Sequence, residues 1–267
     1  MSAVARPLPV TAHASPAPAR RWSRLLPWAG LAVAAALWWV GAALLTLRTP
    51  IAASFAPWPS LLALLKLVSG GDIGWHVWVS LQRVAVGLGL AVAIGVPLGV
   101  LTGLSRHFAA GSTPIFQFLR MVSPLSWMPI AVMVLGVGDA PVYFLLAFAA
   151  TWPMLLNTAA GVSQLDANWL LLARSLSATR REMVLRVVLP GITAHILTGV
   201  RLAIGIIWIV LVPAEMLGVS AGLGYFILDT RDRLAYSELM AAIVLVGALG
   251  YGLDLAARAL HRRWLHR

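Results

Sequence analysis

The sequence has 267 residues, of which 60% are hydrophobic and 11% charged, and its mean hydropathy is +0.88. A soluble domain this apolar would lack the polar surface needed to cover its core, so the composition predicts an all-α membrane protein whose backbone is hydrogen-bonded within helices. The 20 Arg and Lys outnumber the 9 Asp and Glu, and cysteine is absent; the basic clusters between apolar segments favour contact with membrane lipid over nucleic acid, and Cys-ligated metal sites are excluded.

The chain is predicted to have two basic tails around one transmembrane domain. Residues 1–24 contain four prolines and three closely spaced arginines, and we interpret them as a disordered cytoplasmic tail. Residues 25–260 form the transmembrane domain, and residues 261–267 form a second basic cytoplasmic tail. The apolar segment after residue 24 is too long for a signal-peptide core, so we expect a retained anchor.

Six segments approach the roughly 20 apolar residues that a membrane-spanning helix needs. They are 25–47, 84–104, 121–138, 140–165, 196–217 and 239–257. The apolar segment 51–65 is short and lies among prolines, so we predict a helix on the membrane surface. Arginine clusters before the first helix, between the fourth and fifth and at the C-terminus place both termini in the cytoplasm by the positive-inside rule.

Small residues and prolines shape the predicted helices. Gly95, Gly99 and Gly103 form a stripe that lets another helix approach closely. Pro97, in the same helix, and the prolines of segment 121–138 are expected to bend or break their helices.

The segment 166–190, DANWLLLARSLSATRREMVLRVVLP, is too polar to span the membrane. Its leucines and valines have helical spacing, which predicts short amphipathic helices suited to docking on a cytoplasmic partner.

This segment resembles the loop signature of the permease subunits of binding-protein-dependent ABC importers: Glu-Ala-Ala, three residues, Gly, nine residues, Ile, one residue, Leu-Pro. Every spacing is kept from Leu171 to Pro190, although Leu171 stands for Glu, Leu172 for Ala, Ser177 for Gly and Val187 for Ile. Segments beginning at Ser80, Leu119 and Ala214 also resemble the nitrate, sulfonate and taurine branch, so the likeness covers roughly residues 75–260.

The resemblance implies a type I (MetI-like) permease fold, a second permease copy lining one pore, and a bacterial inner-membrane location. It also implies a separate cytoplasmic ABC ATPase that uses ATP and Mg. The residues expected to couple to that ATPase are Leu171, Leu172, Ala173, Arg174, Ser175, Leu176, Ser177, Ala178, Thr179, Arg180 and Pro190. For each arginine, anchoring at lipid headgroups is the alternative role.

The chain itself is predicted to bind no cofactor and no metal. Its one lysine, Lys66, lacks the glycine-rich setting of a phosphate-binding loop, so we expect no ATPase site of its own. Its histidines are scattered without metal-ligand spacing. We therefore expect a transport subunit rather than an enzyme.

Ionisable residues in membrane segments are costly, so Arg83, Arg201, Glu215 and Asp254 are candidates for pathway roles. Each lies near one end of its predicted segment, where pairing or snorkelling explains it equally well. The candidate pathway or gate residues are Met133, Arg201, Trp208, Glu215 and Met216. The resemblance implies that a periplasmic loop with Gly222, Gly224, Tyr225 and Asp229 docks a periplasmic or lipid-anchored solute-binding protein.

These patterns predict the transmembrane permease subunit of an ATP-driven importer for a small anion such as nitrate, a sulfonate or taurine. The alternative is an ion-coupled secondary transporter, which should carry acidic residues or histidines near mid-membrane and paired half-helices. The sequence has neither, and it offers no nucleophile and base pair for a membrane-embedded hydrolase.

Overall fold

The computed structural model describes residues 26–265, which are almost entirely helical and contain no strand. The chain divides into two compact units, residues 1–57 and 58–267. The first unit contains α1 (Leu26–Thr46) and the 3₁₀ helix η2 (Pro50–Phe55), joined by a hydrogen bond from the Trp38 indole to the Phe55 carbonyl at 2.9 Å. Most α1 side chains are exposed, as expected for a helix that faces lipid.

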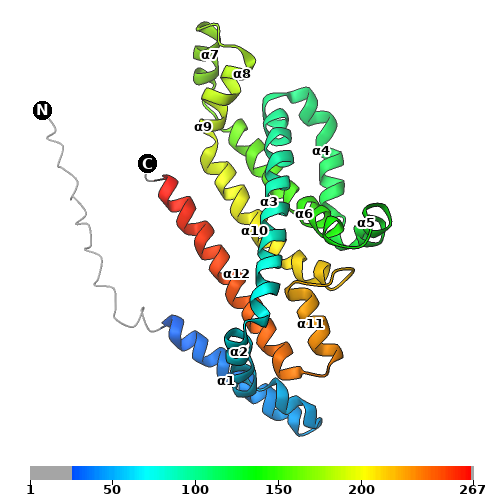
Figure 1. Cartoon of the computed structure of the whole chain (residues 1–267). Helices are drawn as coiled ribbons and strands as arrows, with labels where there is room; N and C mark the ends of the chain where they lie inside the picture. Colours follow the sequence, from blue (N-terminus) through cyan, green and yellow to red (C-terminus); the bar gives the residue numbers. More distant parts are fainter. Residues whose placement is uncertain (1–25, 266–267) are drawn as a thin grey trace, which may run out of the picture. The chain divides into compact units, whose positions relative to one another are not determined.

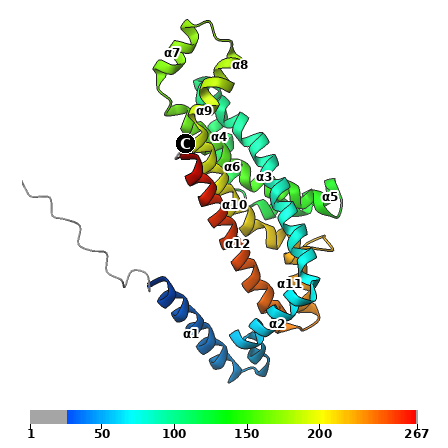
Figure 2. The ribbon, with the colours of Figure 1, turned by 60° about the vertical axis from the view of Figure 1, so that its left-hand side comes forward.

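The second unit carries the rest of the fold (Figures 1 and 2). Its helices are α2 (Pro57–Gly70), α3 (Asp72–Leu104), α4 (Arg106–Met121), η3 (Pro124–Trp127), α5 (Met128–Leu135), α6 (Asp139–Ser163), α7 (Ala167–Ser175), α8 (Arg180–Glu182), η4 (Met183–Val188), α9 (Leu189–Gly191), α10 (Thr193–Glu215), α11 (Leu223–Asp232) and α12 (Tyr236–Leu265).

The core of this unit forms where α3, α6 and α10 pack together (Figure 1). Leu145, Leu146 and Met154 of α6 are fully buried there, together with Ile207 and Leu211 of α10. Because α6 lies between the other two helices, it has the most buried face of the bundle.

The predicted glycine stripe on α3 is the surface that contacts α6. A Cβ added at Gly95 would lie 2.6 Å from Met154 Cβ, and one at Gly99 would lie 2.6 Å from the Leu155 carbonyl oxygen. No larger side chain fits at these separations. The close-packing role predicted for the stripe is therefore confirmed.

The predicted third span, 121–138, is wrong as a single helix. Pro124 begins the 3₁₀ helix η3, and α5 has only 8 residues. Together with α4, this segment forms a pair of helices bent by 87°. Within residues 26–265, five helices are long and apolar enough to cross a membrane, or six if this pair counts as one span.

The predicted second span, 84–104, is too short. Helix α3 begins at Asp72, so Arg83 lies well inside it rather than near its outer end. The segment 51–65 forms η2 and most of α2, whose side chains are mainly exposed. Tail 1–24 lies outside the described residues, and the first part of tail 261–267 continues α12 to Leu265.

The segment α7–α9 lies at one end of the α3, α6 and α10 bundle, toward which the C-terminal end of α12 also points (Figures 1 and 2). Helix α11 lies at the other end. The two ends therefore present different surfaces, one rich in arginine and one built around the glycines that precede α11.

Candidate functional site: the coupling loop and the buried charge cluster

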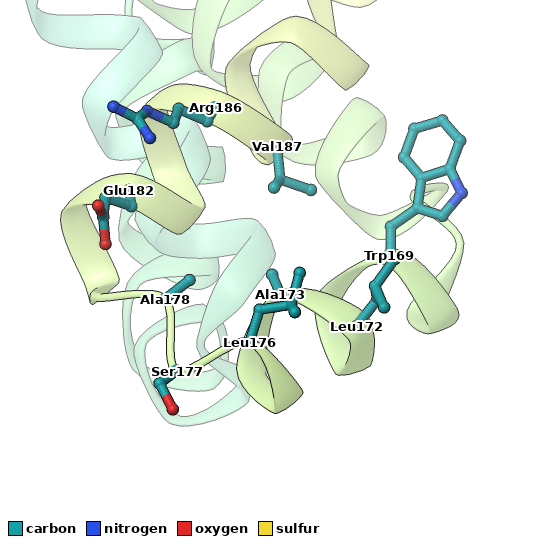
Figure 3. A pocket seen from close by; sticks show the side chains of 9 residues that line it. All are labelled: Trp169, Leu172, Ala173, Leu176, Ser177, Ala178, Glu182, Arg186 and Val187. Atoms are coloured by element: carbon teal, nitrogen blue, oxygen red, sulfur yellow. The ribbon is translucent and has the colours of Figure 1, made fainter.

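The loop predicted to couple to an ATPase folds as two short helical arms joined by a tight turn (Figure 3). Asp166 caps the first arm, α7, by accepting a hydrogen bond from the Asn168 amide. Thr179 and Glu182 form a capping box at the start of the second arm: the Thr179 hydroxyl oxygen accepts from the Glu182 amide, and the Glu182 carboxylate accepts from the Thr179 amide. The two caps fix where each arm starts.

The hydrogen bonds from Thr179 also lower the pKa of the Glu182 carboxyl below its ordinary value of 4.5. The backbone amide is the largest cause, the hydroxyl follows, and the charge of Arg186 adds to them. Glu182 is therefore ionised near neutral pH. Its negative charge stabilises the N-terminus of the helix that it caps.

The turn between the arms is a Schellman motif centred on Ser177, which has a left-handed backbone with φ 57°. The Ala178 amide donates to the Ala173 carbonyl, and the Ser177 amide donates to the Arg174 carbonyl, both at 3.0 Å. This pattern usually places glycine at the left-handed residue. The position where the ABC permease signature has Gly is thus the one position in the loop whose backbone favours glycine.

An open groove of about 670 Å³ lies between the two arms (Figure 3). Trp169, Leu172, Leu176 and Val187 give it an apolar lining, and Arg186 borders it. The side chain of Leu176 is 74% exposed, and its neighbours Leu171 and Leu172 are also exposed. Such apolar exposure on a polar loop is typical of a surface that a partner covers.

The base of the loop is anchored in the bundle. Val188 and Ile192 are fully buried and pack against Val100 of α3 and Val162 of α6. The hydrogen bonding widens to a π-helix over Met183–Val188, which ends two residues before Pro190. These packed side chains connect the base of the loop to α3 and α6.

At the opposite side of the bundle, Arg83 and Glu215 form a buried ion pair with a 2.7 Å separation. Their side chains are 3% and 0% exposed. The Arg83 guanidinium also donates to Asp139 at the start of α6 and to the Ala221 carbonyl. The pairing explanation for Arg83 and Glu215 is confirmed, and they join α3, α6 and α10 at one point.

Two further groups donate hydrogen bonds to the Glu215 carboxylate, one from α3 and one from α11. The Ser80 hydroxyl donates to Glu215 at 2.8 Å, and the Gly224 amide donates at 2.9 Å. The Ser80 oxygen accepts from the Leu223 amide, and His76 Nδ1 accepts from the Gly222 amide at 3.1 Å. The carboxylate is therefore fully solvated by protein groups, which is what a buried charge requires.

Comparison with known proteins identifies the family. Residues 95–266 match the family model described as the binding-protein-dependent transport system inner membrane component. The chain belongs to this family.

Relatives of this permease are transport-system proteins. It is 38% identical over 195 residues to the bicarbonate transport system permease protein CmpB of Synechococcus elongatus, covering 72% of this chain and 69% of the relative. It is 40% identical to the nitrate import permease protein NrtB of Leptolyngbya laminosa, over 68% of this chain and 66% of the relative. It is 32% identical to the taurine transport system permease protein TauC of Escherichia coli, over 87% of this chain and 86% of the relative.

The fold of the permease is that of a solved transporter subunit. It matches a chain of the MetNI methionine ABC transporter in an inward-facing conformation with a TM-score of 0.59 and 16% identity, covering 70% of this chain and 94% of that one. The predicted MetI-like fold is confirmed.

The candidate pathway residues of the permease are not gathered at one place. Met133 lies exposed on α5, while Trp208 packs between α10 and α12 and donates to the Val246 carbonyl at 3.2 Å. Arg201 pairs with Asp254 at 3.3 Å. Met216 follows Glu215 at the end of α10 and is half-buried.

Two of the four candidate docking residues, Gly222 and Gly224, lie against the buried pair. A Cβ at Gly222, where φ is 119°, would lie 2.6 Å from the Glu215 carboxylate. Gly224 lies against the Val212 carbonyl. Tyr225 stacks on the ring of His76 with centroids 6.0 Å apart, and Asp229 pairs with Arg233 at 2.8 Å. The two glycines thus have a packing role, whatever else they contact.

Sequence reasoning missed Ser80 and Asp139 as partners of the buried pair. Ser80 is three residues before Arg83 and therefore on the same face of α3, a spacing that could have identified it. Asp139 had no comparable signal, because its contact with Arg83 depends on where α6 begins.

Proposed function

We propose that this permease imports a small oxyanion into the cytoplasm as one of two copies around a shared pathway, driven by a separate ABC ATPase. The relatives belong to transport systems for bicarbonate, nitrate and taurine, which supports a small anion as the solute. These relatives favour an ATP-driven importer over an ion-coupled secondary transporter. The partner ATPase would bind ATP and Mg, because the sequence of this chain has no phosphate-binding loop.

The observation that carries this proposal is the exposed surface of the coupling loop. Three exposed leucines, at 171, 172 and 176, lie beside Arg174 and Arg180, which form no ion pair with any residue that the structure describes. A partner with an apolar cleft and acidic rim would cover both kinds of side chain. Closure of that partner would push on Val188 and Ile192 and so switch the bundle between inward-open and outward-open states.

The proposed orientation places the coupling loop and both termini in the cytoplasm. These segments carry the arginine clusters, and arginine-rich segments stay on the cytoplasmic side of the membrane. The opposite end, with Gly222, Gly224, Tyr225 and Asp229, would then face a periplasmic or lipid-anchored solute-binding protein. Met133, Arg201, Trp208, Glu215 and Met216 remain the candidate pathway or gate residues, with Glu215 acting as a structural partner of Arg83.

The test is reconstitution of the permease with its ATPase and binding protein in vesicles, with ATP hydrolysis measured across nitrate, bicarbonate, taurine and alkanesulfonates. At least one of these solutes should stimulate hydrolysis and accumulate in the vesicles. Accumulation without the ATPase would refute the proposal.

The coupling loop is tested by Ala178→Asp, because Ala178 is half-buried in the groove between the two arms. The introduced carboxylate should abolish solute-stimulated hydrolysis while membrane insertion stays normal. Ala178→Ser is the matched control and should retain uptake. Normal uptake by Ala178→Asp would show that this loop does not dock the ATPase.

A further inference from the structure

One arginine beside the bend between α4 and η3 has no carboxylate partner among the described residues. Arg120 lies fourteen residues after Arg106, about 21 Å along α4, immediately before the 87° bend to η3 and α5. Within the described part of the chain it forms no ion pair, whereas Arg83, Arg201 and Arg258 each contact an acidic residue. When α4 and the η3–α5 segment are counted as one broken span, Arg120 falls near its middle, where an unpaired charge is costly and indicates a functional site.

The Arg120 side chain lines a small pocket between α3, α4 and α6. Thr113, Gln117 and Arg120 are spaced by four and three residues, so they share one face of α4. Trp152 and Phe116 form an aromatic wall, with ring centroids 6.1 Å apart. The pocket has a volume of about 30 Å³, room for about one or two water molecules.

Trp152, which lines the pocket, carries an unused hydrogen-bond donor. Trp152 is 9% exposed, and its indole N–H is buried with no hydrogen-bond partner among the described residues. Buried indole N–H groups usually have a partner. The indole can only donate, as can the Arg120 guanidinium, and the lining contains no carboxylate. The missing partner is therefore an acceptor, and the local charge favours an anion.

We propose that Arg120, Gln117, Thr113 and the indole N–H of Trp152 form an intramembrane binding site for the oxyanion headgroup of the transported solute. This inference rests on the proposed function and names the site on its pathway. The planar guanidinium presents paired donors to two oxygens of such a headgroup. The pocket has room for about two oxygens of such a headgroup beside the buried indole, and the rest of the solute would lie along the exposed side chains of Arg120 and Gln117.

The buried Glu215 does not oppose this site. Its charge is neutralised by Arg83 and by hydrogen bonds from Ser80 and Gly224. The unpaired positive charge at Arg120 thus attracts an anion without a competing carboxylate nearby.

The test uses the complete complex in vesicles of phosphatidylcholine with and without phosphatidylglycerol, with nitrate, bicarbonate and taurine as probes at saturating binding protein. Arg120→Gln should lower the maximal uptake rate by about 10- to 100-fold, the range for loss of a charged hydrogen bond. Arg120→Lys should restore part of it. Trp152→Phe keeps the ring, removes the N–H and should lower the rate several-fold. Arg262→Gln, an exposed arginine at the end of α12, is the control and should leave uptake unchanged.

The outcomes separate this inference from the proposed function. Uptake by the wild-type complex together with normal rates for Arg120→Gln and Trp152→Phe would overturn the anion site alone. A wild-type complex that moves none of the three anions would overturn the proposed function and this site with it. A defect confined to vesicles with phosphatidylglycerol would assign Arg120 to a lipid headgroup and overturn the site. If Arg120→Gln fails to assemble, Trp152→Phe and Gln117→Leu decide by the same criterion.

Discussion

Removal of Arg83 is the sharpest test of the buried charge cluster. Arg83→Met leaves the Glu215 carboxylate fully buried, with only the Ser80 hydroxyl and the Gly224 amide to stabilise it. Breaking one partner of a buried pair costs about 3–5 kcal/mol. The contact with Asp139, which is 53% exposed, contributes only about 0–1 kcal/mol of this.

A second change should recover much of that loss. In Arg83→Met/Glu215→Gln, the neutral amide keeps an oxygen that can accept from Gly224 and no longer needs a counter-charge. We expect the double variant to be more stable than Arg83→Met by about 2 kcal/mol, because an uncompensated buried charge costs more than a neutral pair.

The assay is equilibrium unfolding of the purified chain in mixed micelles, followed by circular dichroism, with Arg231→Met as an exposed control that should change stability by less than about 0.5 kcal/mol. If the double variant is as unstable as Arg83→Met, or less stable, the pair does not act through charge compensation and the reasoning is refuted.

Three further predictions concern packing and the coupling loop. Gly99→Ala should destabilise the chain by about 1–3 kcal/mol in the same assay, because its Cβ would meet Leu155 and Thr158; Gly89→Ala, which has open space around it, is the control, and equal effects would contradict the close packing of α3 on α6. Ser177→Gly should stabilise the loop by about 1 kcal/mol, because glycine adopts the left-handed backbone without strain. The Ala178 amide should then exchange its hydrogen more slowly than in the wild type, and faster exchange would contradict the prediction. The capping box should be fully formed above pH 4.5, the ordinary pKa of glutamate, and should be lost as the pH falls through the lowered pKa of Glu182, because protonation removes the charge that accepts from Thr179. Hydrogen exchange of the Thr179 amide measures this loss. The Glu182→Gln variant is the control, and its exchange should show no such titration.

Local spacing predicted the parts of the fold that depend on neighbouring residues. The four-residue spacing of Gly95, Gly99 and Gly103 was enough to identify the helix contact surface, because one helix face is set by sequence alone. The start of α3 was missed because the predicted charge-free span began directly after Arg83, while the helix extends back to Asp72. The prolines of segment 121–138 were expected to bend or break the helix, and the structure shows a break at Pro124. Which of the two occurs depends on the helices packed around the proline.

In the candidate site, too, the features set by neighbouring residues could be predicted, whereas contacts between distant residues could not. The coupling loop could be located from its signature spacing, and even the serine that replaces glycine occupies the left-handed position. The pair Arg83 and Glu215, separated by 132 residues, could be listed as candidates but not joined, since only the tertiary fold brings them together. Arg120 was missed because the predicted span began one residue after it, and its position beside the bend between α4 and η3 depends on the tertiary fold.

The central claim is that the arms joined at Ser177 face the cytoplasm and contact the ATPase. The chain has no cysteine, so Ser175→Cys on the exposed face of α7 provides a single labelling site. In inverted membrane vesicles, a membrane-impermeant maleimide should label this cysteine when the permease is alone and fail to label it once the ATPase subunit is bound. Labelling only in right-side-out vesicles, or labelling unaffected by the ATPase, would contradict the account.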